Sequence, residues 1–319
     1  MPTSLAKKIS LFPLFSNFKK PELAEIAQNC FIKTLFKDEQ LFVLGEKRDV
    51  FFIVVEGEIG IIRKLGEASQ MVEIVNPGEY IAEHALFNPK ELHSHTAIAI
   101  SKEAVVIGLP GKLFPKLSQK TANKLLLNLL PIISDNFSHA SNRMMTILQI
   151  GQIVGAKITS LETLGTSVLE TLLQAIQAQK ALIALREHAP HQAKIRAIAG
   201  FESTTSILNK MIDLRQDFIL ETTIERGQTI NISETEYLLS KKKVPYVNAS
   251  VLGIPLTIAG KTIGALLLID KKDQHSFNTN NEVLLNIIAE TITLGIRHAE
   301  QTEFQEADRE LRREYIEGV

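Results

Sequence analysis

The stretch Pro77-Gly78-Glu79-Tyr80-Ile81-Ala82-Glu83-His84-Ala85-Leu86, with the polar cluster His93-Ser94-His95-Thr96-Ala97 that follows it, decides how the first half of the chain is interpreted. A Pro-Gly pair is typical of a tight turn, because proline presets φ and glycine tolerates a positive φ. The turn leads into an apolar segment that carries an acid, Glu83. We therefore expect a turn, a short loop and a polar cluster that re-enters a strand.

Short β-branched and aromatic runs surround this stretch between residues 31 and 109. Examples are Phe51-Phe52-Ile53-Val54-Val55, Glu58-Ile59-Gly60-Ile61-Ile62 and Ala104-Val105-Val106-Ile107-Gly108-Leu109. Many short strands at this spacing are typical of an antiparallel barrel or jelly roll. Two short helices are expected before them, within residues 4–29, and a long helix after them, over residues 118–150.

This order of elements resembles the cyclic nucleotide-binding domain of catabolite activator protein, protein kinase A regulatory subunits and gated ion channels. The resemblance covers about residues 3–150. It is carried by Phe36-Lys37-Asp38-Glu39-Gln40-Leu41-Phe42, by Gly45-Glu46 and by Phe51-Phe52-Ile53-Val54-Val55-Glu56-Gly57-Glu58-Ile59. It implies that residues 77–97 form the phosphate-binding cassette, in which a Gly-Glu pair and a downstream Arg-Ser or Arg-Ala pair grip a cyclic phosphate and its ribose.

The resemblance assigns six residues to a cyclic nucleotide site: Gly78, Ala82, Glu83, His93, Ser94 and Thr96. Glu83 is implied to receive the ribose 2′-hydroxyl; the alternative is that it caps its own short helix. His93 stands where the family's arginine would fall, and Ala82 replaces the usual glycine. A histidine offers a phosphate oxygen one donor and is only partly charged near neutral pH, whereas arginine offers a charged fork. We expect an affinity about 10- to 100-fold weaker, or a cassette that is retuned or silent.

Two other motifs admit a different chemistry. His84, His93 and His95 with Glu83 and Glu91 can be interpreted as a metal cluster, because a His-x-His pair puts two imidazoles on one side of a strand. No third ligand is fixed by the spacing, so we expect no metal. Gly260-Lys261-Thr262 ends like a phosphate-binding loop, but Pro255 replaces the required glycine, and we predict a hairpin turn.

The long helical pattern carries a seam of the coiled-coil type. Its apolar positions, at alternating spacings of four and three, are Leu126, Leu130, Ile133, Phe137, Ala140, Met144 and Ile147. The pattern favours a dimer seam, and packing of the helix on its own barrel is the alternative. Pro131 is expected to kink the helix or to mark where it restarts. We predict a homodimer through residues 118–150, as in catabolite activator-like proteins, with a contribution from the exit helix of the second domain.

The second half of the chain resembles a GAF domain over about residues 157–300. The residues that carry this are Val251-Leu252-Gly253-Ile254-Pro255-Leu256-Thr257-Ile258-Ala259-Gly260-Lys261-Thr262-Ile263-Gly264-Ala265-Leu266, then Phe277 and Glu282-x-Leu284-Leu285. The resemblance implies a central antiparallel sheet with helices on one side and a ligand pocket or a bare dimer surface on the other. We expect strands at residues 181–185 and 195–200, a helical stretch around 203–214, and a hairpin across Ala259-Gly260. The pocket residues and ligand stay unidentified.

One motif of this half echoes the GAF domains of phosphodiesterases that bind cyclic nucleotides: Asp270-Lys271, then Phe277, then Asn281-Glu282. Because Asn and Asp are exchanged relative to that pattern, the family's Lys-to-Asp ion pair would become a contact between Lys271 and Asn281. A generic GAF domain without this function is the alternative.

Composition bounds the class of protein. The 319 residues are 45% hydrophobic and 22% charged, enough for two globular domains. A formal net charge of −1 gives no reason to expect nucleic acid or an anionic membrane as partner. The single Cys30 excludes an internal disulfide framework and fits a reducing cytosol. No signal peptide is expected, and the apolar stretch at residues 251–269 is broken by Gly260-Lys261, so no membrane span is expected either.

These observations together predict an α+β protein of two domains. We expect a cyclic nucleotide-binding-like β-barrel or jelly roll with flanking helices at 1–117, a dimerising helix and linker at 118–155, a GAF domain at 156–300 and a helical tail at 301–319. No catalytic motif is present, so we expect a cytoplasmic, non-enzymatic sensor without a cofactor, which binds a cyclic nucleotide or related small ligand and relays it through the dimer helix. The alternative is a ligandless scaffold with degenerate pockets that binds a signalling partner protein.

Overall fold

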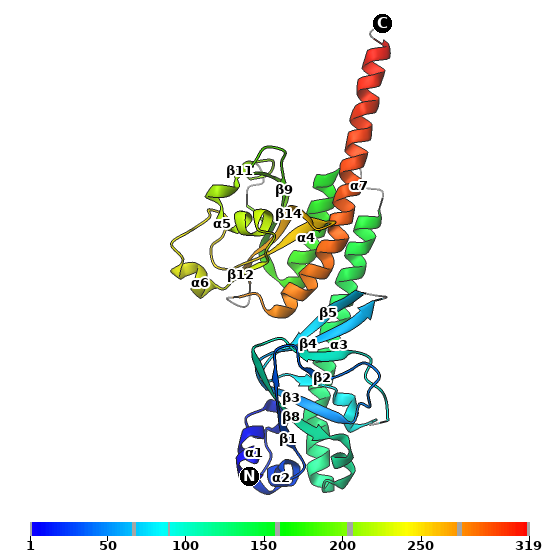
Figure 1. Cartoon of the computed structure of the whole chain (residues 1–319), viewed down its shortest axis with the longest axis vertical. Coiled ribbons are helices and arrows are strands. Elements are labelled where there is room, and N and C mark those ends of the chain that lie inside the picture. Colours follow the sequence, from blue (N-terminus) through cyan, green and yellow to red (C-terminus); the bar gives the residue numbers. More distant parts are fainter. Residues whose placement is uncertain are drawn as a thin grey trace. The chain divides into compact units, whose positions relative to one another are not determined.

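The computed structural model describes residues 2–65, 68–88, 90–156, 160–202, 207–272 and 276–317. The chain divides into two compact units, Met1–Ala140 and Ser141–Val319 (Figure 1). Both units combine helices with antiparallel sheets. The predicted α+β class with two domains is therefore confirmed.

The first unit begins with three short helical segments, α1 (Pro2–Ile9), η1 (Pro13–Phe15) and α2 (Lys20–Ala27). Pro21 lies in the first turn of α2, where its missing N–H costs no helical hydrogen bond. Apolar side chains of these segments pack with β3, β8 and α3 in one core cluster, which includes Ile9, Leu14, Phe15, Ile26, Phe51, Ile107 and Leu125. The predicted short N-terminal helices are confirmed.

Eight strands follow: β1 (Phe31–Phe36), β2 (Gln40–Phe42), β3 (Val50–Glu56), β4 (Ile59–Leu65), β5 (Ala68–Val75), β6 (Tyr80–Ile81), β7 (Thr96–Ala99) and β8 (Glu103–Pro110). They form two four-stranded sheets, of order β1-β8-β3-β6 and β2-β7-β4-β5. All the described pairings are antiparallel, and the described strands form separate sheets without closing into a barrel, so the jelly-roll form of the prediction holds. Gly57 makes the β3–β4 turn possible, because its φ is 71° and a Cβ there would lie 2.2 Å from the Glu103 carbonyl oxygen.

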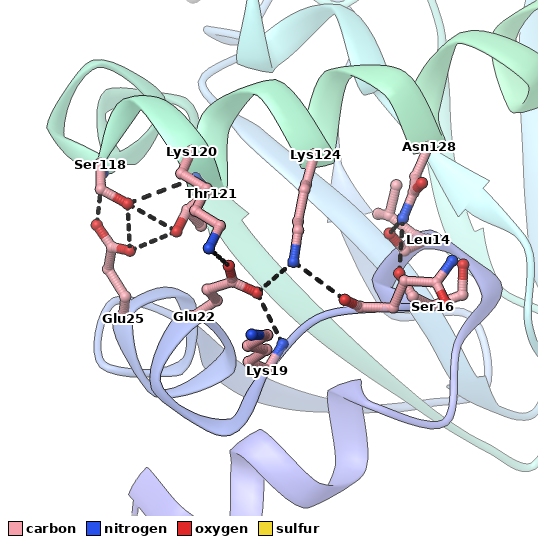
Figure 2. A network of polar contacts seen from close by, with 11 residues as sticks. Leu14, Ser16, Lys19, Glu22, Glu25, Ser118, Lys120, Thr121, Lys124 and Asn128 are labelled. Atoms are coloured by element: carbon pink, nitrogen blue, oxygen red, sulfur yellow. Dashed lines mark hydrogen bonds and ion pairs between the residues drawn. The ribbon is translucent and has the colours of Figure 1, made fainter.

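The helix α3 (Gln119–Gly155) begins in the first unit and continues through Pro131. Figure 2 shows how its first turns are fixed to α2. The Glu25 carboxylate accepts hydrogen bonds from the Thr121 hydroxyl at 2.7 Å and from the Ser118 amide at 2.6 Å. The Glu22 carboxylate accepts from Lys124 Nζ at 2.7 Å. These bonds lower the pKa of both glutamates, the larger effects coming from Thr121 and Lys124 respectively.

A second set of hydrogen bonds lies one turn further along α3. The Asn128 side-chain amide donates to the carbonyl oxygens of Leu14 at 2.8 Å and Ser16 at 3.1 Å, so α3 also holds the segment η1 (Figure 2). Beyond this point, residues 134–140 of α3 are exposed. The beginning of the helix is therefore held by the N-terminal segments, whereas residues 134–140 are exposed.

The second unit is built on a six-stranded antiparallel sheet of order β11-β10-β9-β14-β13-β12. Its strands are β9 (Ala178–Arg186), β10 (Gln192–Ala199), β11 (Met211–Asp213), β12 (Ile230–Ile232), β13 (Val251–Ile258) and β14 (Lys261–Lys271). β13 and β14 pair across Ala259 and Gly260, so the predicted hairpin is confirmed. The predicted helix at 203–214 is wrong where the structure describes it: Met211–Asp213 pairs with the edge of β10, and this pairing overrides the local pattern. Residues 203–206 lie outside the described chain.

Helices cover both faces of this sheet, so the expectation of helices on one side only is wrong. α4 (Leu161–Ile176) and α7 (Thr279–Glu317) pack on one face through a core that includes Leu172, Ile183, Leu285 and Ile292 (Figure 1). η4 (Leu214–Gln216), α5 (Phe218–Leu220), η5 (Glu221–Glu225) and α6 (Glu234–Leu239) accompany the other face. There a second core joins Leu182, Ile195 and Leu267 to Ile224, Tyr237 and Tyr246.

Candidate functional site

The cassette starts with a tight turn at the end of β5. Gly78 has a φ of 94°, and its amide donates to the Val54 carbonyl oxygen at 2.9 Å. The Glu79 carboxylate accepts the Asn76 amide at 2.7 Å and so holds the other side of the turn. Tyr80 then enters β6, stacks on Phe51 at 5.8 Å between ring centroids, and accepts the Leu14 amide at its hydroxyl. Hydrogen bonds and ring stacking thus hold the turn against the sheet and the N-terminal segments.

Ala82 takes a conformation that favours glycine. Its φ of 64° and ψ of 41° lie in the left-handed region, immediately before the one-turn helix η2 (Glu83–Leu86). A side chain in this region costs roughly 1–2 kcal/mol relative to the right-handed form. The backbone therefore keeps the shape that a glycine would give, while the alanine methyl adds strain and bulk.

Glu83 contacts the long helix α3. Its Oε1 accepts a hydrogen bond from the Asn136 side-chain amide at 2.7 Å, and the residue is half-buried. The acid that the sequence assigned to a ribose hydroxyl thus already has a polar partner on α3. One carboxylate joins the cassette to the helix.

His93 lies inside the first unit, stacked on an aromatic ring. Its ring centroid is 3.6 Å from that of Phe42 at an interplanar angle of 9°, and the residue is 6% exposed. Its amide donates to the Glu46 carbonyl, and its own carbonyl accepts the Gly45 amide, each at 2.8 Å. Burial, and next the positive charge of Arg48, lower the pKa of His93 to about 4. The imidazole is therefore neutral at physiological pH, and its role as a phosphate ligand stays a prediction.

The two hydroxyl residues of the cluster have local partners. Ser94 is exposed, and its Oγ shares a hydrogen bond with His95 Nδ1 at 2.8 Å. Thr96 Oγ1 accepts the Leu44 amide at 3.1 Å. Five of the six predicted site positions therefore lie between β5 and β7, and the sixth, Thr96, is the first residue of β7.

Arg48 belongs to this region although the sequence alone gives no sign of it. Its guanidinium forms an ion pair with Glu91, and its amide donates to the Glu91 carbonyl at 2.8 Å. Its Nε is buried without a hydrogen-bond partner among the described residues. An isolated antiparallel β-bridge between Lys47 and Leu92 brings the segment that carries Arg48 beside His93. No local pattern signals this arrangement, because it depends on pairing between distant segments, yet it supplies a cation next to the histidine.

The histidines do not form a metal centre within the part of the chain that the structure describes. No group of three or more His, Cys, Asp or Glu side chains there is arranged to hold an ion. Similarly, none of the described helices combines the length and apolarity needed to cross a membrane.

The phosphodiesterase-like residues of the second unit form hydrogen bonds with its backbone. Asp270 is 1% exposed and has a φ of 57°; its carboxylate accepts the amides of Asn248 and Ala249 and lies 3.2 Å from Lys180 Nζ. Lys271 Nζ donates to the Ile176 carbonyl. Asn281 exchanges hydrogen bonds with Asn278 at the start of α7. These contacts anchor the loop before β13 and the start of α7.

The sheet face under α5 and α6 is closely packed around a buried acid. Asp217 Oδ2 accepts the Tyr246 hydroxyl at 2.7 Å, and Oδ1 accepts the amides of Ile219 and Leu220. Burial raises the pKa of Asp217 and, together with the Asp217 carboxylate, that of Tyr246. This pair therefore ties the start of α5 to the loop before β13.

Family comparisons agree with the two folds. Residues 32–121 match the family model of the cyclic nucleotide-binding domain, and residues 160–296 match that of the GAF domain. The chain therefore carries a cyclic nucleotide-binding domain followed by a GAF domain, as the resemblances predicted. These domains are typical of regulatory and sensory proteins. The finer domain boundaries given above stay predictions.

Several solved structures are similar to one half of the chain. The N-terminal domain of a transcriptional regulator from Streptomyces coelicolor A3(2) has 26% identity and a TM-score of 0.35, covering 40% of this chain and 94% of that one. A cyclic nucleotide-binding domain from Methylobacillus flagellatus KT has 20% identity and a TM-score of 0.40, covering 45% and 82%. The GAF domain of a phosphoenolpyruvate-protein phosphotransferase from Coxiella burnetii has 22% identity and a TM-score of 0.43, covering 51% and 96%. No curated protein sequence matches the chain.

Proposed function

We propose that this chain is a signal-transduction sensor that binds a cyclic nucleotide or a related small ligand in its cassette and relays the binding through a dimeric α3 to the GAF domain. The observation that carries the proposal is the hydrogen bond between Glu83 and Asn136. The acid expected to receive a ligand hydroxyl is the same acid that contacts the relay helix. Ligand and helix therefore share one carboxylate.

This sharing gives the ligand a means of biasing α3. A ligand changes a conformational equilibrium only if it interacts differently with the two states. A hydroxyl that bonds to Glu83 competes with the Asn136 amide or reorients the carboxylate that Asn136 contacts. Binding at the cassette and the position of residue 136 are therefore linked.

The polar contacts of α3 indicate which part of the helix responds. Thr121, Lys124 and Asn128 are bonded to the N-terminal segments, whereas residues 134–140 are exposed. Pro131 lies between these parts and lacks the amide that would bond to the preceding turn. We place the hinge of the relay at Pro131, with the segment that includes Asn136 as the moving part.

An apolar row on α3 supports the homodimer. Leu130 is 59% exposed, Phe137 74% and Met144 60%, and these residues recur at heptad spacing. Exposed large apolar side chains in such a row are typical of a helix that packs against a second helix. A second copy of this chain is the partner that we propose.

Calorimetric titration of the full chain with 3′,5′-cyclic AMP, cyclic GMP and cyclic dinucleotides tests the ligand, and hydrogen-exchange mass spectrometry tests the relay. We expect one of these ligands to bind and to change the hydrogen-exchange rate of residues 130–140. The affinity of the Glu83→Gln variant for this ligand should be at least 10-fold weaker. Glu103→Gln, an exposed acid on β8, is the matched control. Because His93 is neutral well above its pKa of about 4, we expect equal affinity at pH 6 and pH 8.

Two results would contradict the proposal, and a third would change the role of His93. Silence across the whole panel would favour the alternative, a ligandless scaffold that binds a signalling partner protein. Binding without any change of exchange in α3 would remove the relay. Tighter binding at pH 6 than at pH 8 would show instead that the ligand charges His93 and uses it directly.

A further inference from the structure

A cavity of about 1340 Å³ lies at one end of the six-stranded sheet in the second unit. It is lined by the end of β9, part of β10, the end of η5 and the β13–β14 hairpin. Four of its lining residues are cations: Arg186, Arg196, Arg226 and Lys261. Of the described residues in the core around Tyr246 and Asp217, only Ile224 lines the cavity. This cavity is therefore a separate feature from that core.

Two irregularities of the sheet place residues in this cavity. In β10 the partners pass from Ile195 with Ala184 to Ala197 with Ile183, so Arg196 is an extra residue without a partner on β9. In β14 the partners pass from Gly264 with Leu256 to Thr262 with Thr257, which leaves Ile263 extra in the same way. Both extra residues line the cavity. Bulges commonly redirect a side chain beside a functional site.

The bulge in β10 also reverses which face its residues use. Ala193 and Ile195 belong to the core under α5 and η5, whereas Ala197 and Ala199 belong to the core under α4 and α7. Regular alternation would have kept all four on one face. Arg196 is the residue at which the faces change over, and it is half-buried and lines the cavity.

The charges of the cavity are only partly neutralised. Arg226 pairs with Glu221 at 2.7 Å, and Glu225 pairs with His191 at 2.6 Å. Glu187 and Glu300 are the other acids of the lining. Arg186, Arg196 and Lys261 form no hydrogen bond or ion pair through their side chains with any residue that the structure describes. With four cations and three glutamates the lining carries a formal charge of +1, and three of the cations have no side-chain partner among the described residues.

We propose that this cavity binds a small organic phosphate. Arginine forks bond two oxygens of a phosphate at once, and Lys261 adds a point charge at the start of β14, beside the hairpin turn. A phosphate ester carries up to two negative charges and three acceptor oxygens, to which the three cations without a side-chain partner among the described residues can donate. Leu185, Ile224 and Ile263 give the same cavity an apolar surface for the organic part of the ligand. The site is independent of the cassette and adds a second input to the proposed sensor.

Isothermal titration of the full chain with inorganic pyrophosphate tests the phosphate site, with citrate as a polycarboxylate of similar charge. We expect pyrophosphate to bind and Arg196→Gln to weaken it by about 10- to 100-fold, since one charged hydrogen-bonding group is lost. Lys261→Gln, in an exposed turn, should weaken it by about 10-fold. Lys194→Gln removes the same charge from the same strand outside the cavity lining and should change the affinity less than about 2-fold.

Three outcomes would overturn the proposal. No binding of pyrophosphate rejects the site. Equal losses in Arg196→Gln and Lys194→Gln would show general charge attraction without a site. Citrate binding more tightly than pyrophosphate would reject the phosphate class. Glu83→Gln should leave pyrophosphate binding unchanged, so failure here and failure of the cassette proposal are distinguishable. Circular dichroism of each variant confirms that the fold is intact.

Discussion

The two candidate sites of this chain differ in whether their polar side chains already have partners within the protein. In the cassette, His93 stacks on Phe42 and Glu83 accepts the Asn136 amide. In the cavity of the second unit, Arg196 and Lys261 have no side-chain partner among the described residues. A group with a partner contributes to the fold and must give up that contact to bind a ligand. An unpaired cation gives up only its hydration.

The two sites would therefore respond differently to a ligand. Binding in the cassette exchanges one set of contacts for another, so it is suited to moving α3. Binding in the cavity adds contacts, so it is suited to stabilising the second unit by mass action. The same difference predicts that mutations in the cassette change stability as well as ligand affinity, whereas mutations in the cavity change ligand affinity with little effect on stability.

The largest expected effect is the loss of stability in His93→Ala. Removing a buried ring that stacks at 3.6 Å leaves a cavity, and we expect the free energy of unfolding of the first unit to fall by about 2–4 kcal/mol. Arg196→Ala should change that of the second unit by less than about 0.5 kcal/mol. Urea unfolding followed by hydrogen-exchange mass spectrometry gives the free energy of unfolding separately for residues 31–110 and for residues 160–296.

His93→Phe is the control for this comparison, because it keeps an aromatic ring against Phe42. It should recover most of the stability lost in His93→Ala. A loss in Arg196→Ala as large as that in His93→Ala would break the distinction between the two sites, and would make Arg196 a structural residue.

The next effect is a pH dependence confined to the first unit. The pKa of His93 falls from 6.5 to about 4 on folding, so the unfolded chain binds the proton more readily. The stability of the first unit should therefore fall as the pH decreases from about 6.5 towards 4, by about 2 kcal/mol at pH 5. Urea unfolding at pH 7 and pH 5 measures it.

His93→Phe again separates this effect from other titrations. Carboxylates such as Glu22 and Glu25, whose pKa values are lowered on folding, contribute their own loss of stability at lower pH in both proteins. The difference between wild type and His93→Phe isolates the histidine. An identical loss between pH 7 and pH 5 in the two proteins would mean that the ring titrates normally and is accessible.

The sequence predicted the architecture well because its signals are local. Alternating short strands indicated the sheets of the first unit, and Ala259-Gly260 marked the hairpin. Each depends on the conformational preferences of neighbouring residues. The helix expected at 203–214 failed where Met211–Asp213 found the open edge of β10, since a tertiary pairing overrides a local preference.

The sites were less predictable because they depend on direction and register. Position in the chain placed His93 in the cassette, but it did not show that the ring turns onto Phe42. Arg48 is brought beside it by the pairing of Lys47 with Leu92, which no local pattern reveals. The cavity depends on bulges at Arg196 and Ile263, and a shift of one residue in register leaves no mark in a sequence of alternating apolar residues.

A smaller effect tests the link between cassette and helix. Asn136→Ala removes the amide that bonds Glu83 at 2.7 Å, and for an exposed charged hydrogen bond we expect a loss of about 1 kcal/mol in the first unit. Asn142→Ala, an exposed position of the same helix, is the control. In a double-mutant cycle Glu83→Gln and Asn136→Ala should be non-additive by about 0.5–1 kcal/mol. Strict additivity would show that the contact does not form in solution.

The smallest effect reports the strain at Ala82. Its φ of 64° disfavours a Cβ, so Ala82→Gly should stabilise the first unit, but the greater flexibility of glycine in the unfolded chain offsets part of the gain. We expect a net increase of about 0.5–1 kcal/mol in urea unfolding. Ala85→Gly, at a fully buried position three residues on, should destabilise instead. If Ala82→Gly destabilises as well, the left-handed turn is absent, and the cassette lacks the backbone shape on which its comparison with the family rests.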